Sequence, residues 1–338
     1  MRKIVRGVVA ATAATALLVT AGCSGDESAT PEKAGGQTSV QKVSYLTGLG
    51  LLGRESFVYV AEKKGFFAEV GLEVEVRPGA GTASNLGLLE AGKVDFAAVD
   101  VAAGLIEYGK GTHKNFKIIS AIHQRALACI IALEGSGITS PRDLSGKSVG
   151  FIPGGTNYTL FPLYAQLAGL DPKSVEFVQA KAENVQQFLA AGQVDAITQL
   201  VVGKPTVEAA AKGRPTVVLP YSDYITDLYG NGVGVSTKTL TERRDLVSKF
   251  NGALLRGLQY SIDHPDEAGQ IFKEFNKQGN EKAAAAEMDL MKPYVLGGTK
   301  VGAMDPQRVA RSIAVLQGAG LMPDGVTPDG VVDFGLIS

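Results

Sequence analysis

The sequence predicts an α/β protein made of two similar units, each with the order strand, helix, strand, helix, strand. The main observation is a repeat, since LLEAGKVDFA at 88–97 returns as FLAAGQVDAI at 188–197 with five of ten letters identical. In each copy, apolar residues at helical spacing lead to a glycine and then to a short apolar run typical of a buried strand. A period of 100 residues is far longer than a solenoid repeat, so it indicates two sister units.

Length and composition agree with two globular units. A chain of 338 residues has room for about two domains, and 45% apolar residues can fill two cores. The formal net charge is −1, and no cluster of Lys and Arg follows Arg6. Binding to a polyanion requires a basic surface, so we expect no nucleic-acid partner.

Residues 1–22 predict a lipoprotein signal peptide. A basic start is followed by a run of small apolar residues at 7–19, which is too short for a membrane-spanning helix. The segment Thr20-Ala21-Gly22-Cys23 resembles the cleavage box of bacterial lipoproteins, with Thr20 in place of the usual leucine. Residues 23–41 have the polar, Gly/Pro/Ser-rich composition of a flexible tether. We expect a lipid on Cys23 that anchors the protein at the extracytoplasmic face of the cell membrane; ordinary secretion is the alternative.

The first unit begins with a strand at 42–47 and continues with a helix at 55–67 and a strand at 71–76. The first copy of the repeat then supplies a helix and a buried strand. Gly92, and Gly192 in the second copy, fit the left-handed position just past a helix C-terminus. Asp95 and Asp195, at the start of the following strands, fit a structural role in bonding backbone amides locally. A further strand, FKIISAI, runs into HQRALACIIAL, and the polar turn-rich segment 140–147 marks the first crossover between the units.

The second unit starts at SVGF (148–151), repeats the same order and ends near PTVVLPYSDY (215–224). The glycine-rich YGNGVGV (229–235) fits a strand that returns to the first unit. The rest is helical, with helix starts at Asp305-Pro306 and Thr327-Pro328, and would cover the first sheet or brace the two units. The expected lobes are therefore 42–132 with 230–338, and 133–229.

The runs YVAEKKGFFAEVGLEVEV, GAG, LLEAGKVDFA and SPRDLSGKSVG together resemble the substrate-binding proteins of ABC importers. The resemblance is to the branch of sulfonate-binding (SsuA-like) and NMT1/THI5-like proteins, and it covers the chain from about residue 43 to its end. It implies the type II periplasmic-binding-protein fold, in which two Rossmann-like lobes are joined by two crossover segments, here with extra C-terminal helices. It also implies a small-molecule solute held between the lobes, with an ABC permease and its ATPase as partners.

Two segments match motifs of other activities. Gly48-Leu49-Gly50-Leu51-Leu52-Gly53 matches the dinucleotide fingerprint between a strand and a helix, so an NAD-dependent enzyme is an alternative. The helix is expected to start only after Arg54, however, and such a bend also suits a binding protein. Gly146-Lys147-Ser148-Val149-Gly150 matches the nucleophile-elbow pattern and contains the Gly-Lys-Ser of a phosphate loop. Both matches are false, because the segment lies where a strand begins.

Two further alternatives come from the resemblance. Fungal THI5-like members make the thiamine pyrimidine and carry a cysteine-rich motif, whereas this chain has only Cys23 and Cys129, and Cys129 fits a buried apolar position. A cell-surface solute sensor would use the same fold. The three histidines show no metal spacing, so we expect no metal site. We also expect no catalytic residues and no cofactor, and we expect a monomer.

The ligand is expected where strands end and helices begin, because ligands of open α/β sheets bind at the carboxyl ends of strands. Hydroxyl and amide groups near helix N-termini suit a polar head, arginines add donors, and tyrosines offer flat faces. Helix capping and ordinary packing are the alternative roles for these residues. The candidates are Gly53, Arg54, Thr82, Ser84, Asn85, Asp100, Arg125, Thr156, Asn157, Tyr158, Gln199, Tyr221 and Tyr224. The expected solute is a heteroaromatic related to thiamine precursors, with an aliphatic sulfonate next.

Overall fold

The computed structural model describes residues 40–153, 155–181, 184–298 and 300–337. The predicted signal peptide, Cys23 and nearly all of the tether lie outside these ranges. Within the described ranges, no helix combines the length and the apolar character needed to cross a membrane.

Two five-stranded sheets form the framework, in the orders β2-β1-β3-β10-β4 and β7-β6-β8-β5-β9. The strands of the first sheet are β1 (Gln41–Leu46), β2 (Leu72–Arg77), β3 (Phe96–Asp100), β4 (Phe116–Ala121) and β10 (Asn231–Ser236). Those of the second are β5 (Ala128–Leu133), β6 (Ser148–Phe151), β7 (Glu176–Gln179), β8 (Ala196–Leu200) and β9 (Thr216–Pro220).

The two sheets are wound in the same way, and each contains one strand that arrives from the other part of the chain. The first unit supplies β1 to β4 and the second supplies β6 to β9. In both sheets the order from one edge is the unit's second strand, its first, its third, an inserted strand and its fourth. The inserted strand is β10 in the first sheet and β5 in the second, and each is antiparallel to both of its neighbours. The predicted return of the chain at 229–235 is therefore confirmed.

The boundary predicted at residue 132 assigned β5 to the wrong sheet. Its residues pair with β8 and β9, so the first crossover lies between β4 and β5, at 122–127, and not at 140–147. The apolar run ACIIAL predicts a buried strand but carries no information about which sheet will pair with it. The polar turn at 140–147 instead contains a short 3₁₀ helix, η2 (Pro141–Leu144), that leads into β6.

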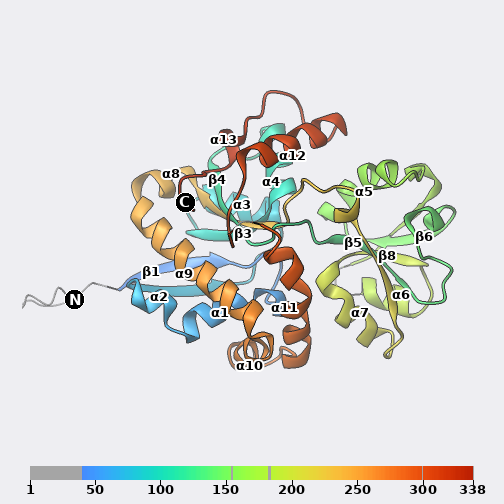
Figure 1. Ribbon diagram of the computed structural model, residues 1–338, viewed down its shortest axis with the longest axis horizontal. Coiled ribbons are helices and arrows are strands. Elements are labelled where there is room, and N and C mark those ends of the chain that lie inside the picture. Colours follow the sequence, from blue (N-terminus) through green and yellow to red (C-terminus); the bar gives the residue numbers. More distant parts are fainter. Residues whose placement is uncertain (1–39, 154, 182–183, 299, 338) are drawn as a thin grey trace, which may run out of the picture. The chain divides into compact units, whose positions relative to one another are not determined.

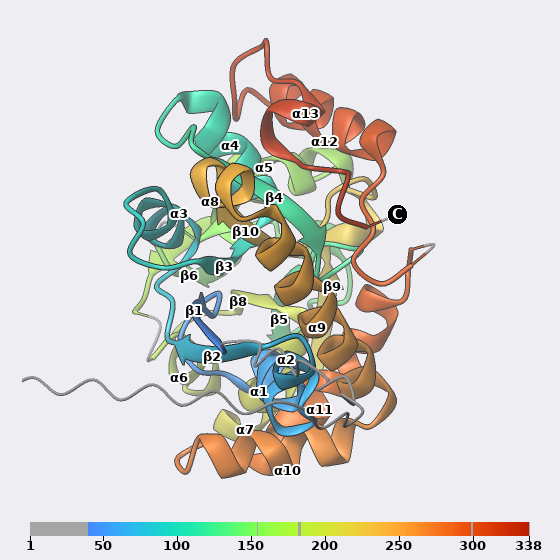
Figure 2. The same cartoon turned by 90° about the vertical axis from the view of Figure 1, so that its left-hand side faces the viewer.

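The central strands β3 and β5 are buried on both faces of their sheets, since alternate residues of each strand enter different clusters. In β3, Phe96 and Ala98 belong to one cluster, and Ala97 and Val99 belong to the other. Phe96 stacks on Phe250 with ring centroids 3.8 Å apart. Around the first sheet, α1, α2 and α9 cover the Phe96 face, while α3, α4, α12 and α13 lie on the opposite face (Figures 1 and 2).

The helices that accompany the first sheet include the whole C-terminal segment. They are α1 (Ser56–Lys63), α2 (Phe66–Glu69), α3 (Thr82–Glu90), α4 (Val101–Lys110), α8 (Thr237–Glu242), α9 (Arg244–Asp263), α10 (Pro265–Phe275), α11 (Glu281–Val295), α12 (Pro306–Gly318) and α13 (Pro328–Val331). The helices of the second part are α5 (Thr156–Leu167), α6 (Val185–Ala190) and α7 (Lys204–Ala210). Three further 3₁₀ turns bear on the site, namely η1 (Gly53–Glu55), η4 (Val201–Gly203) and η5 (Tyr221–Asp223).

The repeated phrase forms the same structure twice. The helices α3 and α6 are followed by Gly92 and Gly192 at φ values of 65° and 70°, as predicted for left-handed positions. Asp95 accepts hydrogen bonds from the backbone N–H and hydroxyl of Ser44, at 2.9 and 3.0 Å. Asp195 accepts the equivalent pair from Ser148, both at 2.8 Å. Both aspartates are structural, but they tie neighbouring strands together and do not bond locally.

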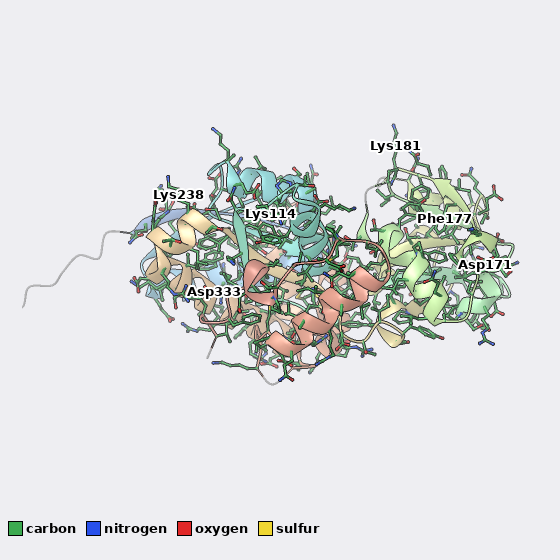
Figure 3. The ribbon with its side chains drawn as sticks, turned by 90° about the horizontal axis from the view of Figure 1, so that it is seen from above. Lys114, Asp171, Phe177, Lys181, Lys238 and Asp333 are labelled. Carbon is green, nitrogen blue, oxygen red and sulfur yellow. The ribbon has the colours of Figure 1, made fainter. Side chains whose placement is uncertain are left out.

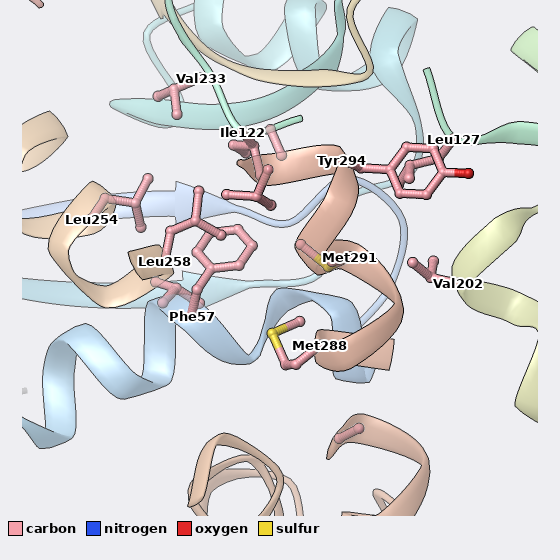
Figure 4. Packing of buried hydrophobic residues seen from close by; sticks show 14 of the residues in the cluster. Phe57, Ile122, Leu127, Val202, Val233, Leu254, Leu258, Met288, Met291 and Tyr294 are labelled. Carbon is pink, nitrogen blue, oxygen red and sulfur yellow. The ribbon is translucent and has the colours of Figure 1, made fainter. Parts of the chain in front are cut away.

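Helix α11 contacts both parts of the described chain, through η1 on one side and through η4 and α7 on the other. Met288 and Met291 are fully buried along it. Figure 4 shows these methionines and Tyr294 on α11, together with Leu127 of the first crossover and Val202 of η4. The prediction that a C-terminal helix braces the two units is thus confirmed for α11.

Candidate functional site

Two glycine-rich loops meet at the carboxyl ends of β1 and β2. The N–H of Gly50 donates to the carbonyl of Gly79 at 2.9 Å, and the N–H of Gly81 donates to the carbonyl of Gly48 at 3.0 Å. A Cβ on Gly79 would lie 1.8 Å from the carbonyl oxygen of Thr47, so only glycine fits there. The loops form one bonded rim at the edge where the sequence places the ligand.

This rim argues against the dinucleotide alternative. A fingerprint loop must offer free amides to a pyrophosphate, but the N–H of Gly48 donates to Glu55 Oε1 at 3.0 Å, and that of Gly50 is bonded within the rim. The third glycine, Gly53, packs against α11, because a Cβ there would lie 2.5 Å from the Cα of Ala284. Gly53 is therefore needed for helix packing, and its contact with a ligand stays a prediction.

Asn85 is a structural residue, so the prediction that it contacts a ligand is corrected. Its side chain is completely buried in α3. The amide nitrogen Nδ2 donates to the carbonyls of Thr47 and Ala98 at 3.0 and 2.9 Å, and Oδ1 accepts from the N–H of Ala80 at 3.2 Å. Asn85 thus ties the rim to β3. The sequence predicts a polar group here, but not that it points inward.

Thr82 and Asp100 lie together at the edge of the first sheet, as predicted. Thr82 Oγ1 accepts a hydrogen bond from the backbone N–H of Asp100 at 2.9 Å. Asp100 caps α4, since Oδ1 accepts from the N–H of Ala103 at 2.9 Å. Burial raises the pKa of Asp100 to about 6. Ser84 is exposed on α3. Because the acidic cap already occupies the N-terminus of α4, that helix end does not favour an anion.

A buried polar cluster next to the rim contains residues that the sequence did not single out. The backbone N–H of Arg54 donates to Glu287 Oε2 of α11 at 2.5 Å. Glu55 Oε2 lies 3.4 Å from the hydroxyl of Tyr45. Burial raises the pKa of both Glu55 and Glu287, and the positive charge of Arg54 opposes that rise at each carboxyl. Polar residues this far apart in sequence give no local signal of their association.

His123 holds the two crossover segments together. The ring nitrogen Nδ1 of His123 accepts from the backbone N–H of Asn231, at the start of β10, at 3.1 Å. The backbone N–H of His123 donates to the carbonyl of Asn231 at 3.0 Å. The side chain is buried, and burial together with the charge of Arg54 lowers the pKa of His123 to about 3. The imidazole is therefore neutral at physiological pH.

Three predicted residues in the two crossovers, Arg125 in the first and Tyr221 and Tyr224 in the second, are engaged with other protein groups. Arg125 Nη2 lies 3.3 Å from both the hydroxyl of Ser222 and a carboxylate oxygen of Asp223. Tyr221 is completely buried and stacks on Tyr164 with ring centroids 4.1 Å apart, so its predicted contact with a ligand is corrected to core packing. Tyr224 is 40% exposed and meets Tyr164 edge-on.

In the second part, two predicted residues are in contact. Asn157 Nδ2, in the first turn of α5, donates to the carbonyl of Gln199 at 2.9 Å at the end of β8. The side-chain Oε1 of Gln199 accepts from the N–H of Leu200. Thr156 is the first residue of α5 and is partly exposed. The strand-end rule thus brings Asn157 and Gln199 together as expected.

Tyr158 is 38% exposed, and its ring is held by neighbouring aromatics. It stacks on Phe151 at 4.1 Å between ring centroids and meets Phe177 edge-on at 4.9 Å. Phe177, labelled in Figure 3, and Pro162 line a surface groove with it. One face of Tyr158 is therefore occupied by the protein. Among the described residues, no group of three or more His, Cys, Asp or Glu is arranged to hold a metal ion.

Comparisons with known proteins show the family and the fold of the chain. Residues 55–268 match the family described as NMT1/THI5 like. A protein of Haemophilus influenzae named for thiamine biosynthesis is 26% identical over 269 residues, covering 79% of this chain and 83% of that protein. The formylaminopyrimidine-binding protein of Halalkalibacterium halodurans is 23% identical over 228 residues, covering 67% and 68%.

Relatives with an enzyme name also match. The 4-amino-5-hydroxymethyl-2-methylpyrimidine phosphate synthase of Candida albicans is 24% identical over 254 residues, covering 70% of this chain and 72% of that protein. Among solved structures, the periplasmic aliphatic sulphonate binding protein SsuA of Escherichia coli superposes with a TM-score of 0.68 at 13% identity, covering 86% of this chain and 97% of that one. This likeness confirms the predicted periplasmic-binding-protein fold.

Proposed function

Because the chain belongs to the NMT1/THI5-like family, we propose that it is the extracytoplasmic solute-binding protein of an ABC importer. In this role it captures a small polar solute and delivers it to a membrane permease, which is driven by its own ATPase. It performs no chemistry on the solute.

The matched winding of the two sheets carries this proposal. Each sheet receives one strand from the other part of the chain, so the two parts are connected by two crossovers and not by a single linker. The carboxyl edges of the parallel strands carry the rim at 48–53 and 79–81 in one part and Asn157 with Gln199 in the other. A solute bound to both edges would favour a closed arrangement, because a ligand shifts an equilibrium by its differential affinity.

The side chains around the rim favour a heteroaromatic solute over a sulfonate. Glu55, Glu287 and Asp100 place three carboxyl groups in this region, and the guanidinium of Arg125 already has partners in Ser222 and Asp223. An anion would meet these acidic groups at a cost in free energy. The name of the formylaminopyrimidine-binding relative points to the same chemical class.

The synthase alternative would require reactive groups that fit its chemistry. Cys129 is the one cysteine of the chain besides Cys23. It is completely buried in β5, and burial raises the pKa of its thiol well above the usual range. A protonated, inaccessible thiol is a poor nucleophile and a poor metal ligand, so this residue does not support the alternative. A role as a cell-surface solute sensor would use the same binding site.

Membrane attachment through Cys23 is part of the proposal. Replacing Cys23 by serine should leave an uncleaved or freely secreted protein, because the lipid is added at that sulfur. Detergent phase separation of cell fractions measures this attachment. Wild-type protein that stays in the aqueous phase would contradict it.

The solute class is tested with a thermal-shift panel on the purified full chain. The panel contains 4-amino-5-hydroxymethyl-2-methylpyrimidine, riboflavin and ethanesulfonate. A ligand at 100 times its Kd adds about 2.7 kcal/mol of stability, which shifts the melting temperature measurably. We expect a shift with a heteroaromatic compound. A shift with ethanesulfonate alone would replace the heteroaromatic assignment by the sulfonate one.

A further inference from the structure

Two buried hydrogen-bond donors near the rim have no partner among the described residues. These are Arg54 Nε, on η1, and His123 Nε2, in the first crossover. A buried donor without an acceptor costs about 1 to 3 kcal/mol, so two of them in one region call for an acceptor that the described residues do not provide.

The proton on His123 can be assigned from its surroundings. Nδ1 faces the backbone N–H of Asn231 at 3.1 Å and must accept that hydrogen bond. The low pKa of His123 keeps the ring neutral, and a neutral imidazole carries a single N–H. That proton therefore lies on Nε2. The free ring nitrogen is a donor, like Arg54 Nε.

The backbone segments that carry the two donors are both hydrogen-bonded to α11. The N–H of Arg54 bonds to Glu287 of α11, and the N–H of Gln124, next to His123, bonds to the carbonyl of Tyr294 on that helix. Glu287 and Tyr294 are seven residues apart, which is two helical turns and about 10 Å. The charge of Arg54 also contributes to the low pKa of His123, so the two side chains act on each other.

The surroundings indicate what the acceptor is. The side chain of Arg54 is partly exposed, and its neighbour Leu52 is 39% exposed at the rim. His123 is connected to the rim through Asn231, whose side-chain nitrogen lies beside Gly48. Glu55 and Glu287 flank Arg54. A fully charged anion would face both carboxyl groups, whereas neutral ring nitrogens and carbonyl oxygens can accept from these donors without that repulsion.

We propose that Arg54 Nε–H and His123 Nε2–H form a donor pair that binds a ring nitrogen or carbonyl oxygen of a heteroaromatic solute. This assignment rests on the proposed solute-binding function and deepens it. His123 is then a contact residue that fixes solute orientation, and the same residue links the two crossovers through Nδ1. Occupation of its Nε2 is thereby coupled directly to the segments that join the two parts.

Two substitutions of His123 separate its two nitrogens. In His123→Asn the amide oxygen takes the place of Nδ1 and still accepts from Asn231, but no donor reaches the Nε2 position. In His123→Gln the longer amide supplies a donor near Nε2 and loses the acceptor near Nδ1. We expect His123→Asn to keep the melting temperature and to weaken binding about five- to tenfold, the loss of one hydrogen bond. His123→Gln should do the reverse. Arg54→Lys keeps the charge, removes Nε–H and should also weaken binding.

Titration calorimetry of the full chain with 4-amino-5-hydroxymethyl-2-methylpyrimidine and with riboflavin measures these effects. His113→Asn is the matched control, because His113 bonds to Glu90 at 2.7 Å on α3, and its replacement should leave affinity unchanged. If wild type binds a probe and folded His123→Asn binds it equally well, the donor pair serves an internal water and the assignment is overturned. If wild type binds neither probe, the solute class in the proposed function fails, and the assignment fails with it.

Nitrogen-15 NMR of the histidine rings gives an independent readout. The unliganded protein should show a single neutral His123 tautomer protonated at Nε2 between pH 5 and 8, since its pKa is about 3. Saturating probe should shift the Nε2–H resonance of His123 and not that of His113. A shift of neither resonance, in a sample that calorimetry shows to be saturated, would overturn the assignment and leave the binding function intact.

Discussion

Replacement of Asn85 by alanine should destabilise the protein strongly, although Asn85 lies in a loop-to-helix segment where substitutions are often tolerated. The side chain is completely buried and makes three hydrogen bonds to backbone groups of Thr47, Ala80 and Ala98. Two of these are carbonyls that Nδ2 binds at 3.0 and 2.9 Å in the buried edge of the sheet. No water can replace the lost donors without entering the core.

The size of the effect follows from those three bonds. A neutral hydrogen bond contributes about 1 kcal/mol net, so removing three should lower the free energy of unfolding by about 3 kcal/mol. The small cavity left by the amide adds to this cost. Ser84→Ala on the same helix is the control, because Ser84 is exposed and its loss should change stability by less than about 0.5 kcal/mol.

Urea unfolding monitored by circular dichroism measures both variants against wild type. The transition midpoint of Asn85→Ala should fall with little change in slope. If Asn85→Ala and Ser84→Ala unfold with the same midpoint, the three bonds do not hold the rim, and the reasoning is refuted.

Three further outcomes are expected. Burial raises the pKa of Asp100 to about 6, so the folded state binds the proton of this carboxyl more tightly than the unfolded state does. This group therefore makes the free energy of unfolding fall as pH rises from about 4 to 6. Asp100→Asn should flatten that dependence in urea unfolding across this range, and an unchanged dependence would contradict the reasoning. Tyr221→Phe removes a buried hydroxyl that has no partner among the described residues and should raise the free energy of unfolding by about 1 kcal/mol, whereas a loss of stability would show a missed partner. Met291→Ala in α11 should cost about 2 to 5 kcal/mol, and a cost near zero would mean that α11 does not brace the two parts.

The local parts of the fold could be predicted from the sequence because their signals are local. The repeated phrase shows apolar spacing and a helix-ending glycine within ten residues, and both copies form the expected helix and strand. The sheet to which β5 belongs could not be predicted in the same way. Its pairing with β8 and β9 is long-range, and an apolar run fits any buried sheet equally well.

For the candidate site, the sequence located the strand ends but not the direction of the side chains. Asn157 and Gln199 meet there as expected. Asn85 of α3 and Tyr221 of η5 also follow strand ends, but their side chains are buried in the protein. Glu287 could not have been found, because its partner Arg54 is 233 positions away and α11 brings them together only through tertiary packing.

The most direct test of the central claim is equilibrium binding with recovery of the solute. The purified full chain is titrated calorimetrically with 4-amino-5-hydroxymethyl-2-methylpyrimidine, and the compound released afterwards is identified by mass spectrometry. Our account predicts that one molecule binds per chain and that it is recovered chemically unchanged. Recovery of an altered compound would show an enzyme, and the absence of binding to this compound and to riboflavin would contradict the heteroaromatic solute on which the proposed function rests.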